Sequence, residues 1–180
     1  MNKALYHNLR ALIVFGSDVI KQASRELSQA RELLDGILRS GKLSRDNRFM
    51  DRASRYASQV AINQGQLAIA AGGPEQAESI LRDNVSYCRK HAIDYIAEAS
   101  SEYAYACFLC GNYEKAIKMS TEASLHFFHL GSLRGIEMSR KVLTGSLWEQ
   151  GRNAEAERVA SDIASDRLGL RTIRYINGDY

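Results

Sequence analysis

Gly111-Asn112-Tyr113-Glu114-Lys115-Ala116 is the middle copy of a motif that occurs three times in this chain. In each copy an alanine follows a glycine by five positions, and an apolar stripe at helical spacing comes next; the other copies are Gly72-Gly73-Pro74-Glu75-Gln76-Ala77 and Gly151-Arg152-Asn153-Ala154-Glu155-Ala156. The alanines recur at intervals of 39 and 40 residues (77 to 116, and 116 to 156). Such a period is typical of stacked helix pairs, in which no unit buries its apolar face alone. We therefore expect an all-α repeat protein that works by presenting a surface.

The composition agrees with an ordinary water-soluble helical array. The chain has 180 residues, 45% hydrophobic and 25% charged, with a single proline and a net charge of +3. This charge is too small for the footprint of a dedicated DNA-binding protein. The longest apolar run near the start, residues 11–15, is too short to span a membrane. Three cysteines, an odd number, favour a reducing compartment, so we expect a cytoplasmic protein with no membrane partner.

Helical periodicity divides the chain into pairs. Residues 1–50 are expected to form an N-terminal helical pair that breaks near Gly16, followed by a basic loop from about residue 41 to 51. Residues 51–167 are expected to form three helix pairs, and residues 168–180 a tail without clear period. The expected helices are 51–71 and 74–91, 94–110 and 113–130, and 132–150 and 153–167. We expect one continuous domain.

These pairs resemble tetratricopeptide repeats, over roughly residues 54–167. The family pattern places a glycine, an aromatic residue and an alanine around the turn between helices A and B, and the matching residues here are Gly111, Tyr113, Ala116 and Ile117. Ala104 and Ala123 take the family's small positions, while Gly65 with Ala77 and Thr144 with Ala156 match more loosely. The resemblance implies a right-handed superhelix of antiparallel helix pairs. The long repeat, about 40 residues, resembles those of MalT- and Rap-type bacterial regulators.

The same resemblance places a ligand on the concave face, at four positions of each helix A. These positions are Gln59, Ile62, Gln66 and Ile69, then Glu98, Ser101, Tyr105 and Phe108, then Met138, Lys141, Gly145 and Trp148. We expect Ile62 and Ile69 to belong to the core. Phe108 and Trp148 end their helices, so each is expected either in the groove or against the neighbouring repeat. The expected partner-binding set is therefore Gln59, Gln66, Glu98, Ser101, Tyr105, Phe108, Lys141 and Trp148.

Other clusters of polar side chains give weaker indications of a metal or anion site. Cys88 with His91 and Cys107 with Cys110 have zinc-like ligand types, but their helical positions separate the two halves, so buried structural thiols are expected. Glu122, His126 and His129 lie at helical spacing without the pattern of a zinc peptidase. No motif indicates a catalytic residue, a metal site or a cofactor, and we do not expect an enzyme. Arg48, Arg52 and Arg55 share one helical face and are a candidate anion-binding site, with Arg45 nearby and further arginines in the tail, although local ion pairs are the favoured interpretation.

The leading functional hypothesis is a non-enzymatic adaptor or regulator that binds a peptide or partner protein. Two alternatives remain open. The first is a nucleic-acid accessory protein that uses the basic face between Arg45 and Arg55. The second is a scaffold that forms homo-oligomers through its end repeats.

Overall fold

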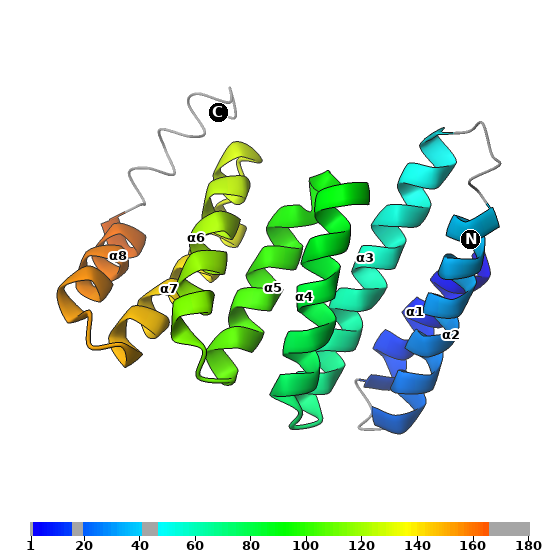
Figure 1. Cartoon of the computed structure of the whole chain (residues 1–180), viewed down its shortest axis with the longest axis horizontal. Coiled ribbons are helices and arrows are strands. Elements are labelled where there is room, and N and C mark those ends of the chain that lie inside the picture. The colour runs from blue at the N-terminus through cyan, green and yellow to red at the C-terminus, as the bar shows by residue number, and fades with distance from the viewer. Residues whose placement is uncertain (1, 16–19, 41–46, 166–180) are drawn as a thin grey trace. The chain divides into compact units, whose positions relative to one another are not determined.

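The computed structural model describes residues 2–15, 20–40 and 47–165 (Figure 1). Within these ranges all the regular structure is helical, which confirms the predicted all-α fold. The elements are α1 (Asn2–Phe15), α2 (Ile20–Ser40), α3 (Asn47–Ala70), α4 (Pro74–His91), the 3-10 turn η2 (Ile93–Tyr95), α5 (Ile96–Leu109), α6 (Tyr113–His129), α7 (Leu133–Glu149) and α8 (Asn153–Ser165). The predicted tail, with its arginines, lies outside the described residues, as does Arg45.

The three motif glycines lie at corners between helices, as the sequence predicts. Gly72, Gly111 and Gly151 have φ of 80°, 73° and 72°, a left-handed conformation that side chains other than glycine adopt at a cost. Gly131, between α6 and α7, makes a fourth corner of the same kind, with φ of 66°. Figure 1 shows α5 and α6 as an antiparallel hairpin closed by such a corner.

One hydrogen-bond pattern closes all four corners. At the Gly111 corner the Asn112 N–H donates to the Cys107 carbonyl at 2.9 Å, and the Gly111 N–H donates to the Phe108 carbonyl at 3.0 Å. This is the Schellman arrangement, which satisfies the last carbonyls of a helix. The Asn112 side chain then accepts from the Lys115 N–H at 3.4 Å and caps the start of α6. Each corner thus ends one helix and begins the next within three residues.

Alanines set the spacing between the paired helices. The motif alanines Ala77, Ala116 and Ala156 are at most 1% exposed, and the two predicted small positions, Ala104 and Ala123, are fully buried. Since an alanine side chain is a single methyl group, the helix axes approach closely and adjacent turns interlock. The two predicted small positions are therefore confirmed as buried.

The helices form two compact units, Met1–Tyr95 and Ile96–Tyr180. The first unit has a core in which α1, α2 and α3 meet, formed by Ala4, Ala11, Ala23, Leu27, Ala30, Leu34, Ala57, Val60 and Leu67. In the second unit, Ala97, Ala123, Phe127 and Ile136 form a core among α5, α6 and α7. The continuous superhelix and its domain boundaries remain predictions, as does the likeness to MalT- and Rap-type repeats.

Two helix starts differ from the predicted ones. Helix α3 begins at Asn47 rather than at residue 51, so it includes the end of the expected basic loop. Phe49 and Met50, both half-buried, extend its apolar stripe backward. Helix α5 begins at Ile96 rather than at Asp94, because residues 93–95 form the 3-10 turn η2.

Candidate functional site

In the second unit, α5 and α7 present the predicted partner-binding positions side by side. The Ser139 hydroxyl of α7 donates to the Ser101 hydroxyl of α5 at 3.2 Å, so the two helices are in direct contact. Tyr105 on α5 is 41% exposed and Trp148 on α7 is 55% exposed. Because Glu98 and Lys141 are also exposed on the same two stripes, these helices carry aromatic, acidic and basic groups on one surface, which we call the A-helix face.

An ion pair fixes the charge pattern of this face. The Lys141 ammonium lies 2.7 Å from the Glu137 carboxylate, one turn back on α7. The hydrogen bond from Lys141, reinforced by its charge, lowers the pKa of Glu137 below its ordinary value. Both side chains are well exposed, so the pair is screened by water and contributes little to stability. The pair neutralises the Lys141 charge locally.

Phe108 takes part in packing between helices. Its ring lies 5.8 Å from the Tyr113 ring, centroid to centroid, and it faces Gly145 of α7. A methyl group at Gly145 would come within 3.2 Å of the Phe108 ring, which explains why a small residue stands there. The half-buried Phe108 therefore packs beside the A-helix face. Trp148 is the more exposed of the two aromatic residues at the ends of α5 and α7.

In the first unit, the corresponding face of α3 is partly used to hold α1. Gln59 donates to the Asn63 side chain at 3.1 Å, and Asn63 donates to the Asn8 side chain of α1 at 2.7 Å. Ile62 is buried, as predicted, Ile69 is half-buried, and Gln66 is exposed. Gln59, one of the two amides expected to set the register of a ligand, thus also belongs to a chain of amide hydrogen bonds between α1 and α3.

The three arginines of the candidate anion site differ in their surroundings. Arg55 contacts two carboxylates, Asp94 at 2.7 Å and Asp51 at 3.1 Å, so its charge is neutralised within the unit and it ties α3 to η2. Arg48 and Arg52 are exposed on the same helix. Within the predicted set, local ion pairing is therefore confirmed for Arg55.

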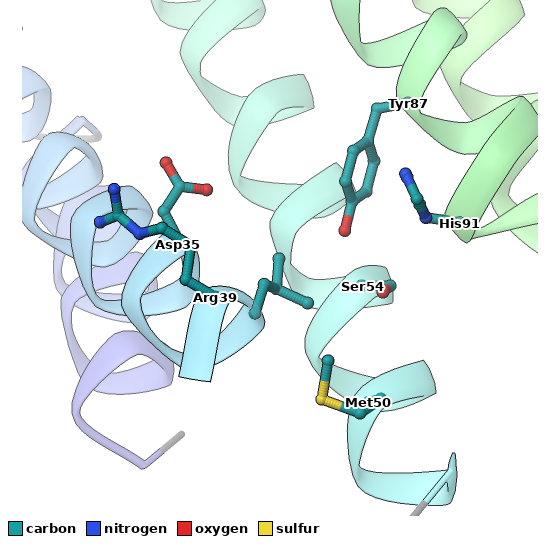
Figure 2. A pocket seen from close by; sticks show the side chains of 7 residues that line it. Asp35, Arg39, Met50, Ser54, Tyr87 and His91 are labelled. Atoms are coloured by element: carbon teal, nitrogen blue, oxygen red, sulfur yellow. The ribbon is translucent and has the colours of Figure 1, made fainter. Parts of the chain in front are cut away.

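A pocket that the sequence did not indicate lies between the end of α2, the start of α3 and the end of α4. It has a volume of about 540 Å³, and its lining is mostly apolar; Leu38, Met50, Ser54, Tyr87 and His91 are among its residues. Figure 2 shows the Tyr87 ring reaching from α4 toward Ser54, with Met50 below and Asp35 and Arg39 on α2 opposite. Tyr87 and His91 are one turn apart, with ring centroids at 5.1 Å.

The Tyr87 hydroxyl is the distinctive polar group of this pocket. Burial raises its pKa above the ordinary value of 10.0, while the Ser54 hydroxyl and the charge of Arg31 oppose the shift. The oxygen is buried, and no described residue gives it a hydrogen bond of acceptable geometry, Ser54 included. It therefore stays protonated and keeps a donor for an incoming group.

The described residues also bear on two other candidate sites. Cys88 and Cys107 are fully buried thiols, as predicted, and Cys110 is half-buried. Among the described residues, no three histidine, cysteine or carboxylate side chains gather closely enough to hold a metal ion. No helix in that part of the chain combines the length and the apolar character needed to cross a bilayer.

No family model and no curated protein matches the sequence. Among solved structures, the chain is similar to a crystal structure of nearly identical TPR-like repeats of a putative kinesin light chain from Podosopora anserina. The identity is 11%, the match covers 94% of this chain and 98% of that chain, and the TM-score is 0.38. A likeness at this TM-score supports no argument, so the proposals below rest on the helices and side chains just described.

Proposed function

We propose that this chain is a protein-interaction module of the adaptor or regulatory kind. It holds a peptide or helix of a partner on the A-helix face of α5 and α7. The observation that carries the proposal is the pair of exposed aromatic side chains, Tyr105 and Trp148, on two helices in direct contact through Ser101 and Ser139. Exposed aromatic groups of this kind supply large contact area at low cost in side-chain entropy.

The charged groups around the aromatics give such a face its selectivity. Glu98 is exposed on the α5 stripe, so a basic group of a partner finds a complement there. Lys141 is already paired with Glu137 and adds a side-chain donor next to that carboxylate. Ser101 adds a hydroxyl group to this face, and Gln59 and Gln66 of α3 are the proposed contacts of the first unit. The nucleic-acid alternative receives no comparable support, because Arg55 is already paired with Asp51 and Asp94.

Trp148 allows a direct test, since it is the only tryptophan of the chain. Partners are captured from native lysate on the immobilised chain and identified by mass spectrometry, then titrated while tryptophan emission is recorded. We expect the emission to shift to shorter wavelength on binding, and we expect Tyr105→Ala with Trp148→Ala to weaken capture by tenfold or more.

Phe128→Ala is the matched control, because Phe128 on α6 is 55% exposed, the same fraction as Trp148. That variant should retain capture. Helicity of all variants is checked by circular dichroism. If partners bind the Tyr105/Trp148 double variant as well as the unchanged chain, the A-helix face is not the binding surface.

A further inference from the structure

A second cavity of the first unit lies on the same three helices as the Tyr87 pocket, at their opposite ends. Its volume is about 620 Å³, and it is lined by the start of α2, the end of α3 and the start of α4. Lys21 and Arg25 of α2 stand on one side, Gln76 and Ile80 of α4 on the other, and Gln64 of α3 between them. None of these residues belongs to the predicted ligand positions of α3.

The lining residues of the two cavities lie on the same faces of α2 and α4, so both cavities follow one line between these helices. On α2 the residues of both cavities fall at Lys21, Arg25, Ser28, Asp35 and Arg39, steps of three, four or seven that keep to one face of a helix. On α4 they fall at Gln76, Ile80, Tyr87 and His91 in the same way. From Gln76 to His91 this line is about 22 Å long at the usual helical rise. We call it the α2–α4 seam.

The two ends of the seam differ in polarity. Beside the start of α2, Lys21 and Arg25 line the cavity, no carboxylate lines it, and neither cation has an ion pair among the described residues. At the other end, Leu38 is one of the residues that line a largely apolar pocket. Figure 2 shows Met50 and Tyr87 of the same lining. The seam thus combines two unneutralised cations with an apolar pocket about four helical turns away.

The second unit contains the repeat-equivalent cavity, and the two cavities differ in the charged side chains that line them. Positions 79 apart correspond (Ala156 to Ala77), so Gln76 of the first unit corresponds to Glu155 of the second, and both line their cavities. Glu155 makes two hydrogen bonds of 2.7 Å with the guanidinium of Arg152, which also lines that cavity. In the second unit the Glu155 carboxylate thus neutralises Arg152, and Arg158 is a second cation of that cavity. The first unit has an amide at the corresponding position, and no carboxylate lines its cavity beside Lys21 and Arg25.

We propose that the α2–α4 seam binds an acidic amphipathic helix of a partner protein, as a surface separate from the A-helix face. Carboxylates of that helix lie at Lys21 and Arg25, and an apolar side chain fills the pocket beside Tyr87. The walls of the seam are helices, whose backbone groups are already paired, so they offer nothing to the backbone of an extended segment. A helix brings its own backbone hydrogen bonds, and about four turns of it match the length of the seam.

The test uses a fluorescent synthetic helical peptide of about 16 residues. Leucines form one face, and glutamates are concentrated in one half; a second peptide has glutamine in place of every glutamate. Anisotropy titrations on the full chain should show binding of the glutamate peptide about tenfold tighter than of the glutamine peptide at low salt, with the difference shrinking as salt is added. Equal affinities for the two peptides would overturn the proposal.

Charge reversal locates the site. Lys21→Glu with Arg25→Glu should weaken binding of the glutamate peptide by about tenfold or more. The matched control is Lys118→Glu with Arg158→Glu in the second unit, which changes the net charge equally and should leave the affinity unchanged. If both double variants lose affinity alike, the peptide responds only to overall charge and the seam is not its site.

Two further measurements separate this surface from the A-helix face. The peptide should shift the backbone amide resonances of Gln76 and Tyr87 while the Trp148 emission stays constant. The variant Tyr105→Ala with Trp148→Ala should bind the peptide as the unchanged chain does. Loss of peptide binding in that variant would assign the peptide to the A-helix face and contradict the proposal.

Discussion

Replacing Gly135 by alanine should destabilise the second unit. Gly135 is buried near the start of α7, and an added Cβ would meet three ring atoms of Phe127 on α6, with Cε1 at 2.6 Å. Favourable carbon contacts need about 3.5–4.0 Å. Phe127 is almost fully buried, so its ring must push on the core in order to retreat.

The expected change in the free energy of unfolding is the sum of two opposing contributions. Overpacking a core typically costs about 1–3 kcal/mol, and the Phe127 contact belongs to the severe end of that range. Alanine regains up to about 1 kcal/mol of helix propensity in a helix interior, and less in the first turn where Gly135 lies. We expect a net loss of about 2 kcal/mol in the free energy of unfolding, equivalent to a fall in Tm of about 4–8 °C for a chain of this size.

Gly36→Ala is the matched control. Gly36 lies inside α2, and an added Cβ there meets nothing within 4 Å, so the same substitution should stabilise by about 0.5–1 kcal/mol. Urea and thermal unfolding followed by circular dichroism compare the two variants. The loss in Gly135→Ala should be partly recovered when Phe127→Leu is added, because contacting residues do not act additively. A Gly135→Ala variant as stable as the unchanged chain would refute this account of α6–α7 packing.

Three other outcomes follow from the described contacts. Gly111→Ala should lower the free energy of unfolding by about 1–2 kcal/mol in urea titrations, because φ at Gly111 is +73°, and Gly111→Asn should lose less. Ser58→Ala should cost about 1–3 kcal/mol in the same assay, because the buried Asn84 amide loses its 3.2 Å bond to the Ser58 hydroxyl; a neutral result would show that the bond does not contribute. For Tyr87 the folded pKa is raised, so its stabilising contribution is present below the ordinary pKa of 10.0 and is lost as pH rises above it through the folded value. Stability measured against pH should therefore fall less steeply at alkaline pH for Tyr87→Phe than for the unchanged chain, and parallel curves would contradict the shift.

The corners and the helix pairs could be predicted from the sequence because their causes are local. A glycine with positive φ and an alanine five positions later fix a corner regardless of what lies elsewhere, and Gly72, Gly111 and Gly151 all behave in this way. The start of α3 was predicted too late because charged residues surround Phe49, which packs only once α3 has formed.

The surfaces could be predicted only in part. Helical register was enough to bring Tyr105, Lys141 and Trp148 to exposed positions on adjacent helices. The Arg55–Asp94 contact joins residues 39 positions apart, and no local sequence pattern predicts it. The Tyr87 pocket and the cationic cavity each need side chains from three helices, so they become visible only when the packing of α2 and α4 on α3 is known.

The contacts within each unit run almost entirely between elements that are consecutive in the chain or one element apart. A chain whose contacts are this local has a low contact order, which favours rapid folding. During synthesis each hairpin can complete its packing soon after it leaves the ribosome, without waiting for a distant stretch of chain. Gain or loss of a whole repeat then alters the binding surface while leaving the remaining interfaces as they were.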